Sequence, residues 1–309
     1  MTLVVREKRA LTPDVVRLRL GRGDGSELPA FEAGAHLELH IAGTTRHYSI
    51  TSLPGERSHY EIAVLRAVPS RGGSAFIHDT LAVGDAVEAD GPHNTFGFVH
   101  RPPYAVFIAG GIGLTPFFTM IHACLASSVP YELHYVTRTA ADRLPIGALG
   151  SSHLFTYVSR ERSEASRPLH IPGLLQRVRR DAHIYVCGPR GMIDAVRAAA
   201  SGLGWPGAAV HSESFGAPLR STDRPILVRL SLSGVTLRVE PGDSILQAML
   251  DHGIWANYAC QRGECGSCYV EVTGGVADHR DTCLSAGQRR AGMCPCVSWS
   301  ATDTLTIRA

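Results

Sequence analysis

The stretch "CQRGECGSC", residues 260–268, places three of the chain's eight cysteines within nine positions. Thiols this close together suit a disulfide knot, a zinc site or an iron–sulfur cluster. The chain starts "MTLVVREKRA" and shows no apolar segment of the kind found in signal peptides, so we expect a cytoplasmic protein. Thiols stay reduced in the cytoplasm, which disfavours a disulfide framework and favours metal binding or catalysis.

The spacing of these cysteines separates the two metal alternatives. Cys260, Cys265 and Cys268 form the pattern C-x4-C-x2-C, which is typical of a plant-type [2Fe–2S] cluster whose fourth thiolate comes from further along the chain. Gly263 and Gly266 permit a loop that wraps such a cluster. A zinc ribbon would use two C-x2-C pairs, and the pair Cys294-x-Cys296 is too tight for the second. The pattern therefore predicts a [2Fe–2S] cluster.

The bulk properties exclude several classes of partner. The chain has 309 residues, enough for two or three domains, with 44% hydrophobic and 19% charged residues. Its formal net charge is +2, so no basic field indicates nucleic acid or an anionic membrane surface. The most apolar run, residues 104–118, is too short and too rich in glycine to span a bilayer.

Hydrophobic patterning divides the chain into three segments. Residues 1–101 carry short alternating runs at 15–20, 36–41, 60–68 and 85–89, which predict a small antiparallel β-barrel. Residues 104–216 alternate buried-strand runs with helical stretches, which predicts a parallel α/β sheet. Residues 225–309 begin with a hairpin that turns at Ser233-Gly234, followed by a helix for which Asp243 is the expected N-cap.

Two glycine-rich junctions suit phosphate groups. In "SRGGSAFIHD" (70–79), Gly72 and Gly73 precede a helix with Ser74 as the expected cap; the alternative is an ordinary capped helix. In "AGGIGLTP" (109–116), a nucleotide pyrophosphate can approach Gly111 and Gly113, with Thr115 as the expected N-cap. This is not the Rossmann fingerprint, because Pro116 stands where a third glycine would be.

The C-terminal segment resembles a plant-type ferredoxin domain. The resemblance covers the hairpin, the helix and "YACQRGECGSCYVEVTGGVADHRD", and "MCPCVSWS" resembles the strand that delivers the last ligand. It implies a β-grasp domain with Cys296 as the fourth ligand at the start of that strand. Cys294 is the second candidate, and Cys283 falls too early.

The first segment resembles ferredoxin–NADP reductase-like flavoproteins through "RHYSI" (46–50), a form of their R-x-Y-S motif. The resemblance implies that Arg46 pairs with the flavin phosphate, that Tyr48 packs on the isoalloxazine, and that Ser49 hydrogen-bonds near its N5. The following "RGGS", Arg71 to Ser74, resembles the members of this superfamily that hold FMN.

The second segment resembles the nicotinamide domain of the same superfamily. "CGPRGM" (187–192) matches its second motif, which implies that Cys187 lies beside the nicotinamide and is followed by Gly188 and Pro189. "SESF" (212–215) resembles its closing segment, with Glu213 and Phe215 against the flavin.

The order flavin barrel, nicotinamide domain, ferredoxin domain resembles the phthalate dioxygenase reductase family, which includes vanillate O-demethylase reductases. The resemblance implies electron transfer from NADH through FMN and the [2Fe–2S] cluster to a Rieske-type oxygenase partner. NADPH stays open, because Arg138 and Arg143 are available to a 2′-phosphate.

Two other functions stay open, a reductase for a cysteine-ligated haem monooxygenase and a non-enzymatic redox sensor. The fifteen histidines show no two-histidine, one-carboxylate spacing, so we expect them to be structural or solvent-facing.

Overall fold

The computed structural model describes the chain except for residues 69–71, 150–152, 161–167, 216–219 and 221. Contacts divide it into two compact units, Met1–Glu213 and Ser214–Ala309. The three predicted domain boundaries stay predictions. Among the described residues, no helix is both long and apolar enough to cross a bilayer.

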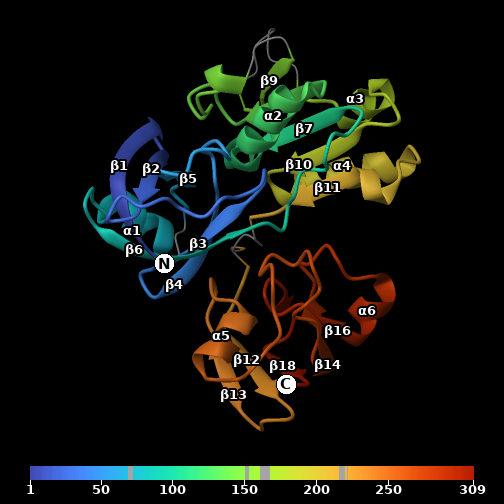
Figure 1. Cartoon of the computed structure of the whole chain (residues 1–309). Helices are drawn as coiled ribbons and strands as arrows, with labels where there is room; N and C mark the ends of the chain where they lie inside the picture. The colour runs from blue at the N-terminus through green and yellow to red at the C-terminus, as the bar shows by residue number, and fades with distance from the viewer. Residues whose placement is uncertain (69–71, 150–152, 161–167, 216–219, 221) are drawn as a thin grey trace. The chain divides into compact units, whose positions relative to one another are not determined.

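The first unit begins with a six-stranded antiparallel sheet in the order β4-β3-β6-β1-β2-β5. An antiparallel bridge between Ile50 and Ile62 joins the end of β4 to β5 and closes the sheet into the predicted barrel (Figure 1). Alternate side chains, such as Leu37 and Leu39, fill its interior. The elements are β1 (Thr2–Thr12), β2 (Val15–Gly21), β3 (His36–Ile41), β4 (Thr44–Ser49), β5 (Tyr60–Leu65), α1 (Gly73–Asp79) and β6 (Ala86–His93).

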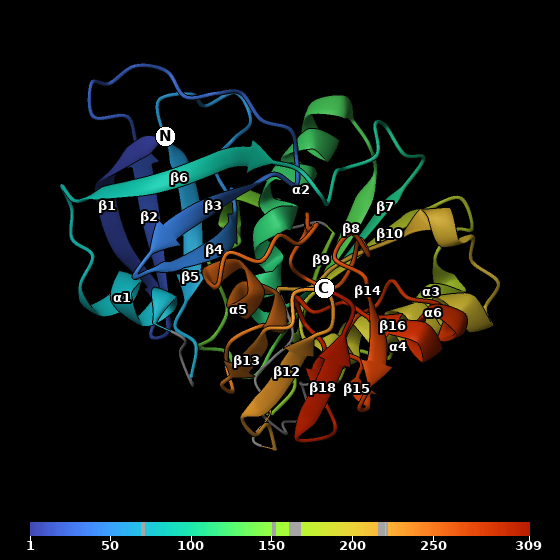
Figure 2. The same cartoon turned by 90° about the horizontal axis from the view of Figure 1, so that it is seen from below.

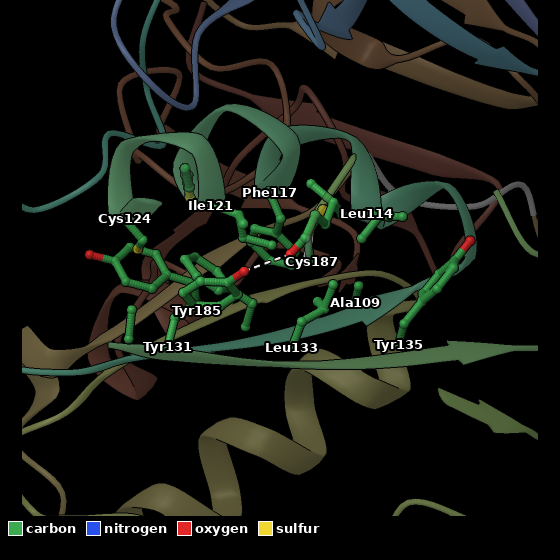
Figure 3. Packing of buried hydrophobic residues seen from close by; sticks show 14 of the residues in the cluster. Ala109, Leu114, Phe117, Ile121, Cys124, Tyr131, Leu133, Tyr135, Tyr185 and Cys187 are labelled. Atoms are coloured by element: carbon green, nitrogen blue, oxygen red, sulfur yellow. Dashed lines mark hydrogen bonds between the residues drawn. The ribbon is translucent and has the colours of Figure 1, made fainter. Parts of the chain in front are cut away.

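A parallel five-stranded sheet follows in the order β11-β10-β7-β8-β9, which confirms the predicted α/β architecture. The run Ala105–Gly110 is buried throughout, because α2 covers one face of β7 while α3 and α4 cover the other. Figure 3 shows Phe117 and Ile121 of α2 lying over Ala109 and Leu133. The elements are β7 (Ala105–Gly110), η1 (Gly111–Leu114), α2 (Thr115–Ser127), β8 (Tyr131–Thr137), η2 (Gly147–Leu149), β9 (Leu154–Val158), α3 (Ile171–Arg177), β10 (His183–Cys187), α4 (Arg190–Gly202), η3 (Gly207–Ala209) and β11 (Val210–Glu213).

The barrel and the parallel sheet share one hydrophobic cluster. Ala63 and Phe96 from the barrel side belong to the same buried cluster as Phe117 of α2. In addition, the Gly34 N–H donates a buried hydrogen bond to Thr119 Oγ1 at 3.0 Å. These contacts hold the two parts of the first unit against each other.

The second unit has the predicted β-grasp arrangement, with strand order β13-β12-β18-β14-β16 and helix α5 over the sheet. Hairpin strands β12 and β13 are antiparallel, whereas β12 and the last strand, β18, are parallel. The elements are β12 (Ile226–Leu230), β13 (Thr236–Val239), α5 (Ile245–Asp251), β14 (Val270–Gly274), β15 (Ala277–Asp278), α6 (Ala286–Ala291), β16 (Gly292–Met293), β17 (Trp299–Ser300) and β18 (Thr304–Ile307).

The three expected helix caps are wrong by one or two positions. Ser244 caps α5 in place of Asp243, because its hydroxyl accepts a hydrogen bond from the Gln247 N–H at 3.0 Å. Helix α1 begins after Gly72, and the Ser74 hydroxyl instead accepts from the Ala67 N–H at 3.1 Å. Thr115 is the first residue of α2, because the 3₁₀ turn η1 precedes it.

Candidate functional site

The loop of residues 260–268 brings its three cysteines around one point of the second unit. Cys260 and Cys268 are buried, and Cys265 is exposed. The N–H groups of Arg262 and Glu264 donate to Cys260 Sγ at 3.4 and 3.5 Å, which is the environment that a thiolate requires. Gly263 has a φ of 72° and leaves no room for a side chain, because a Cβ there would lie 2.4 Å from Val297. The loop therefore needs glycine at this turn.

A fourth thiol reaches this loop from the C-terminal part of the unit. Cys296 Sγ lies 3.3 Å from Cys268 Sγ, while Cys283 Sγ and Cys294 Sγ lie 3.8 Å from each other. Hydrogen bonds from Cys294 and Cys296 lower the pKa of the Cys268 thiol. Four thiols around a buried loop fit the donor set of a [2Fe–2S] cluster. The choice of Cys296 over Cys294 stays a prediction, since both contact Cys268.

The expectation that Cys296 begins a strand is wrong. Cys296 lies in a turn between β16 and β17, and the next strand starts at Trp299. The Leu246 N–H of α5 donates to the Pro295 carbonyl at 3.1 Å, so the helix holds this turn in place.

The sequence analysis did not predict a role for Asp281, whose neighbour Thr282 is hydrogen-bonded to the cysteine loop. Asp281 is fully buried and lies 3.2 Å from His279 Nδ1 and 3.1 Å from an Arg289 guanidinium nitrogen. Its neighbour Thr282 donates through its N–H to the Gly263 carbonyl at 2.8 Å. No motif in the sequence marks this aspartate as buried, because its burial and its contacts with His279 and Arg289 depend on how the chain folds around it.

The residues proposed for the flavin phosphate lie together in the first unit. A Cβ on Gly73, at the start of α1, would lie 3.0 Å from Arg46 Cγ and 3.5 Å from Thr44 Oγ1. The Arg46 side chain therefore runs beside the first turn of α1, where exposed N–H groups and a cation favour an anion. Arg71 lies outside the described residues.

Tyr48 and Ser49 follow Arg46 on the same strand. Burial raises the pKa of the Tyr48 hydroxyl to about 12, while the nearby Arg46 charge opposes that shift. Ser49 is buried at the end of β4 and pairs with His36 of β3. These are the two residue types that the R-x-Y-S resemblance implies, and their roles towards a flavin stay predictions.

The two motifs proposed for the nicotinamide nucleotide are in backbone contact. A Cβ on Gly113 would lie 2.3 Å from the Cys187 carbonyl oxygen, and one on Gly110 would lie 2.5 Å from Pro189 Cδ. Strands β7 and β10 are parallel neighbours with Ala109 opposite Cys187, so both loops leave the same edge of the sheet. Ligands bind at this carboxyl edge in open α/β sheets.

The other predicted nucleotide residues divide into two groups. Gly111, Thr115, Gly188 and Glu213 lie at the same carboxyl edge, with Glu213 buried and paired with Cys187 across β10 and β11. Arg138 follows β8 and is exposed, so its guanidinium is available to a ligand at that edge. Phe215 belongs to the second unit and is 42% exposed.

The comparisons with known proteins agree with a flavin site in the first unit and an iron–sulfur site in the second. Residues 2–98 match the oxidoreductase FAD-binding domain family, and residues 228–299 match the 2Fe-2S iron-sulfur cluster binding domain family. The chain is therefore a flavin- and iron–sulfur-dependent oxidoreductase.

Full-length relatives narrow the class further. The phenoxybenzoate dioxygenase subunit beta of Ectopseudomonas oleovorans is 39% identical over 94% of this chain and 91% of the relative. The heme-dependent oxidative N-demethylase beta subunit of Ectopseudomonas mendocina is 34% identical over 94% of this chain and 93% of the relative.

A solved structure of phthalate dioxygenase reductase, described as modular for electron transfer from pyridine nucleotides to [2Fe–2S], has a TM-score of 0.85 and 31% identity. It covers 100% of this chain, which in turn covers 98% of that structure. The chain belongs to the phthalate dioxygenase reductase family, which includes reductase components of oxygenase systems.

Proposed function

We propose that this chain passes electrons from NADH through FMN and a [2Fe–2S] cluster to a Rieske-type terminal oxygenase that acts on an aromatic compound. The observation that carries the proposal is the presence, in one chain, of a nucleotide cradle at Gly113 and Cys187 and a loop of cluster-binding thiols. A flavin supplies the step from the two electrons of a hydride to the single electrons that a cluster carries. The redox-sensor alternative is set aside, because the family consists of oxidoreductases.

The main predicted residues have the following tasks in this proposal. The Gly111–Gly113 turn and the Cys187–Pro189 turn form the surface on which the nucleotide lies, with Cys187 beside the nicotinamide ring. Arg46 neutralises the flavin phosphate, Tyr48 covers the flavin ring, and Ser49 holds the ring edge that receives the hydride. Cys260, Cys265, Cys268 and Cys296 hold the cluster. The proposed location is the cytoplasm, where such thiols stay reduced.

The proposed flavin is FMN, although the matched family model carries the description FAD-binding. The support for FMN is the anion site of Arg46 and α1, which suits a terminal phosphate, and the lack of any adenine-stacking pattern after "SRGGS" in the sequence. Denaturing the protein and chromatographing the released flavin decides the matter, and a predominance of FAD would refute the FMN proposal.

The proposed nucleotide is NADH. The exposed Arg138 leaves a 2′-phosphate contact available, so the comparison of kcat/KM for NADH and NADPH is the relevant measurement. A clear preference for NADPH would assign Arg138 to that phosphate, and an Arg138→Ala variant would then lose the preference.

The function itself is tested by separating its two halves. Cys268→Ser removes a cluster thiolate, so transfer to an oxygenase partner should fall to background, while NADH reduction of ferricyanide, which accepts from flavin directly, should survive. Ser49→Ala should depress both activities together. A Cys268→Ser variant that reduces its oxygenase at a near-normal rate would remove the cluster from the path.

A haem monooxygenase partner is the second candidate. It is favoured by the full-length match to the beta subunit of a heme-dependent oxidative N-demethylase. Purified oxygenases of the two classes, each mixed with the reductase and NADH, distinguish the candidates by which one accelerates NADH consumption.

A further inference from the structure

The hairpin of β3 and β4 brings two histidines and a glutamate close together. On β3, Leu37, Leu39 and Ile41 fill the barrel core, so His36 and Glu38 belong to the opposite face. On β4, His47 pairs directly with Glu38 across the hairpin. The sequence shows no two-histidine, one-carboxylate spacing, yet strand pairing sets Glu38 opposite His47, and His36 lies two positions before Glu38 on β3.

The three side chains have the geometry of a metal site. One ligand atom from each of His36, Glu38 and His47 lies within 4.8 Å of the other two. The His47 Nδ1 to Glu38 Oε1 distance is 3.7 Å, which is longer than a hydrogen bond. Ligand atoms around one tetrahedral ion lie roughly 3.3–3.5 Å apart when the bonds are about 2.0–2.1 Å. Small side-chain rotations therefore place all three atoms on one ion.

Burial holds this arrangement in place. His36 is 3% exposed, and the side chains of His47 and Glu38 are 14% and 22% exposed. The His36 and His47 rings lie 5.2 Å apart between centroids and 30° from parallel. Strand β3 lies between β4 and β6 in the barrel sheet, so its backbone is fixed on both sides (Figure 2). Residues with so little freedom lose little entropy on binding an ion.

We propose that His36, Glu38 and His47 form a binding site for a divalent first-row transition metal ion such as Zn²⁺, with solvent in the remaining position. Two imidazoles and one carboxylate are donors that suit zinc and its neighbours, whereas Mg²⁺ and Ca²⁺ prefer oxygen ligands alone. The ion would join β3 to β4, the hairpin that carries Arg46, Tyr48 and Ser49. None of the three ligands belongs to that flavin motif, although His36 is the direct cross-strand partner of Ser49, so the ion would lie next to the proposed flavin site.

The test uses the purified holoreductase with its flavin and cluster in place, and Zn²⁺ alone as the probe. Equilibrium dialysis with metal analysis should find one Zn²⁺ per wild-type chain. In His47→Gln and Glu38→Gln, the affinity for that ion should fall by at least the roughly 10- to 100-fold that loss of a supporting group costs at metal sites.

His40→Gln is the matched control, because His40 lies on the same strand but has Asp90 and Thr45 as its partners, at 2.8 and 3.0 Å. It should bind Zn²⁺ like the wild type. X-ray absorption at the zinc edge should show nitrogen and oxygen neighbours at about 2.0–2.1 Å. Unchanged affinity in His47→Gln, or sulfur neighbours at about 2.3 Å that disappear in a Cys283→Ser/Cys294→Ser variant, would overturn the proposal.

Discussion

At the scale of single residues, the nucleotide cradle depends on a close backbone contact between Gly113 and Cys187. Gly113 and the Cys187 carbonyl approach so closely that any side chain at position 113 displaces one of the two loops. Position 191, four residues after Cys187, is the opposite case, because a Cβ on Gly191 would meet nothing within 4 Å. The two glycines therefore make a matched pair for mutation.

Gly113→Ala should lower kcat/KM for NADH by roughly 100-fold, because a shift of about 1 Å misplaces the nicotinamide relative to the flavin. Gly191→Ala should leave this ratio unchanged and slightly stabilise α4. Steady-state kinetics with ferricyanide as acceptor measure both. Equal losses in the two variants, or none in either, would contradict the cradle.

The fourth cluster ligand is a second question at this scale. Cys296→Ser should bleach or shift the visible spectrum of the cluster and lower the iron content, whereas Cys294→Ser should leave both nearly intact. The reason is the short contact of Cys296, whose Sγ lies 3.3 Å from Cys268 Sγ, whereas Cys294 is shared between Cys268 and Cys283, whose Sγ lies 3.8 Å away. Iron loss in the Cys294 variant alone would show that Cys294, and not Cys296, is the fourth ligand.

At the scale of helices and strands, sequence patterns predicted the elements better than their ends. The run at residues 105–110 is buried on both faces, and the alternation at 36–41 fills the barrel, close to the predicted ranges. Cap positions failed at Ser74, Thr115 and Asp243, because neighbouring groups compete for the same N–H donors and a 3₁₀ turn extends α2 backwards.

The candidate sites divide in the same way. The glycine loops and the cysteine loop could be predicted from local motifs, because the spacing of their glycines and cysteines along the sequence is itself the signal. Asp281 and the group His36, Glu38 and His47 were missed, because their neighbours are fixed by strand pairing and tertiary packing, which a single sequence does not display.

The β10–β11 pair carries a pH dependence of its own. His211 stacks on Tyr185 and lies 3.0 Å from His183, and burial together with the His183 charge lowers its pKa to about 4. In the unfolded chain the pKa is near 6.5, so the unfolded state binds the proton more tightly. Stability of the first unit is therefore unaffected above about pH 6.5 and falls as pH drops from there towards 4.

We expect His211 to contribute of order 1–3 kcal/mol to this acid destabilisation, allowing for its partial exposure. His211→Gln should flatten the decline between pH 6.5 and 4 relative to wild type. The measurement is denaturant-induced unfolding at several pH values, with flavin release as the signal that reports unfolding. Parallel curves for the two proteins would show that His211 titrates normally.

At the scale of the whole molecule, the two units bury separate cores. The buried residues of the first three hydrophobic clusters all precede Val210, and those of the other two begin at Ile226. Each unit therefore has the apolar interior that independent folding requires.

A fragment of residues 1–216 should fold, bind flavin and reduce ferricyanide with NADH at close to the full-chain rate. It should not reduce an oxygenase, because the cluster is gone. Circular dichroism and the two assays report folding and function separately. A fragment that is insoluble or loses its flavin would show that the first unit requires the second.

The hydrophobic cluster shared by the barrel and the parallel sheet has a consequence for genetics. Leu39 lies in the core of the barrel alone, so damage there should appear as a flavin-binding defect. Phe96 packs against Phe117 and Tyr185, at 6.2 Å between ring centroids in both cases, so one codon change there reaches both halves. In a mutational screen, alleles at Phe96 should be pleiotropic, losing flavin and nucleotide binding together, and suppressors of them should arise on either side of the shared core.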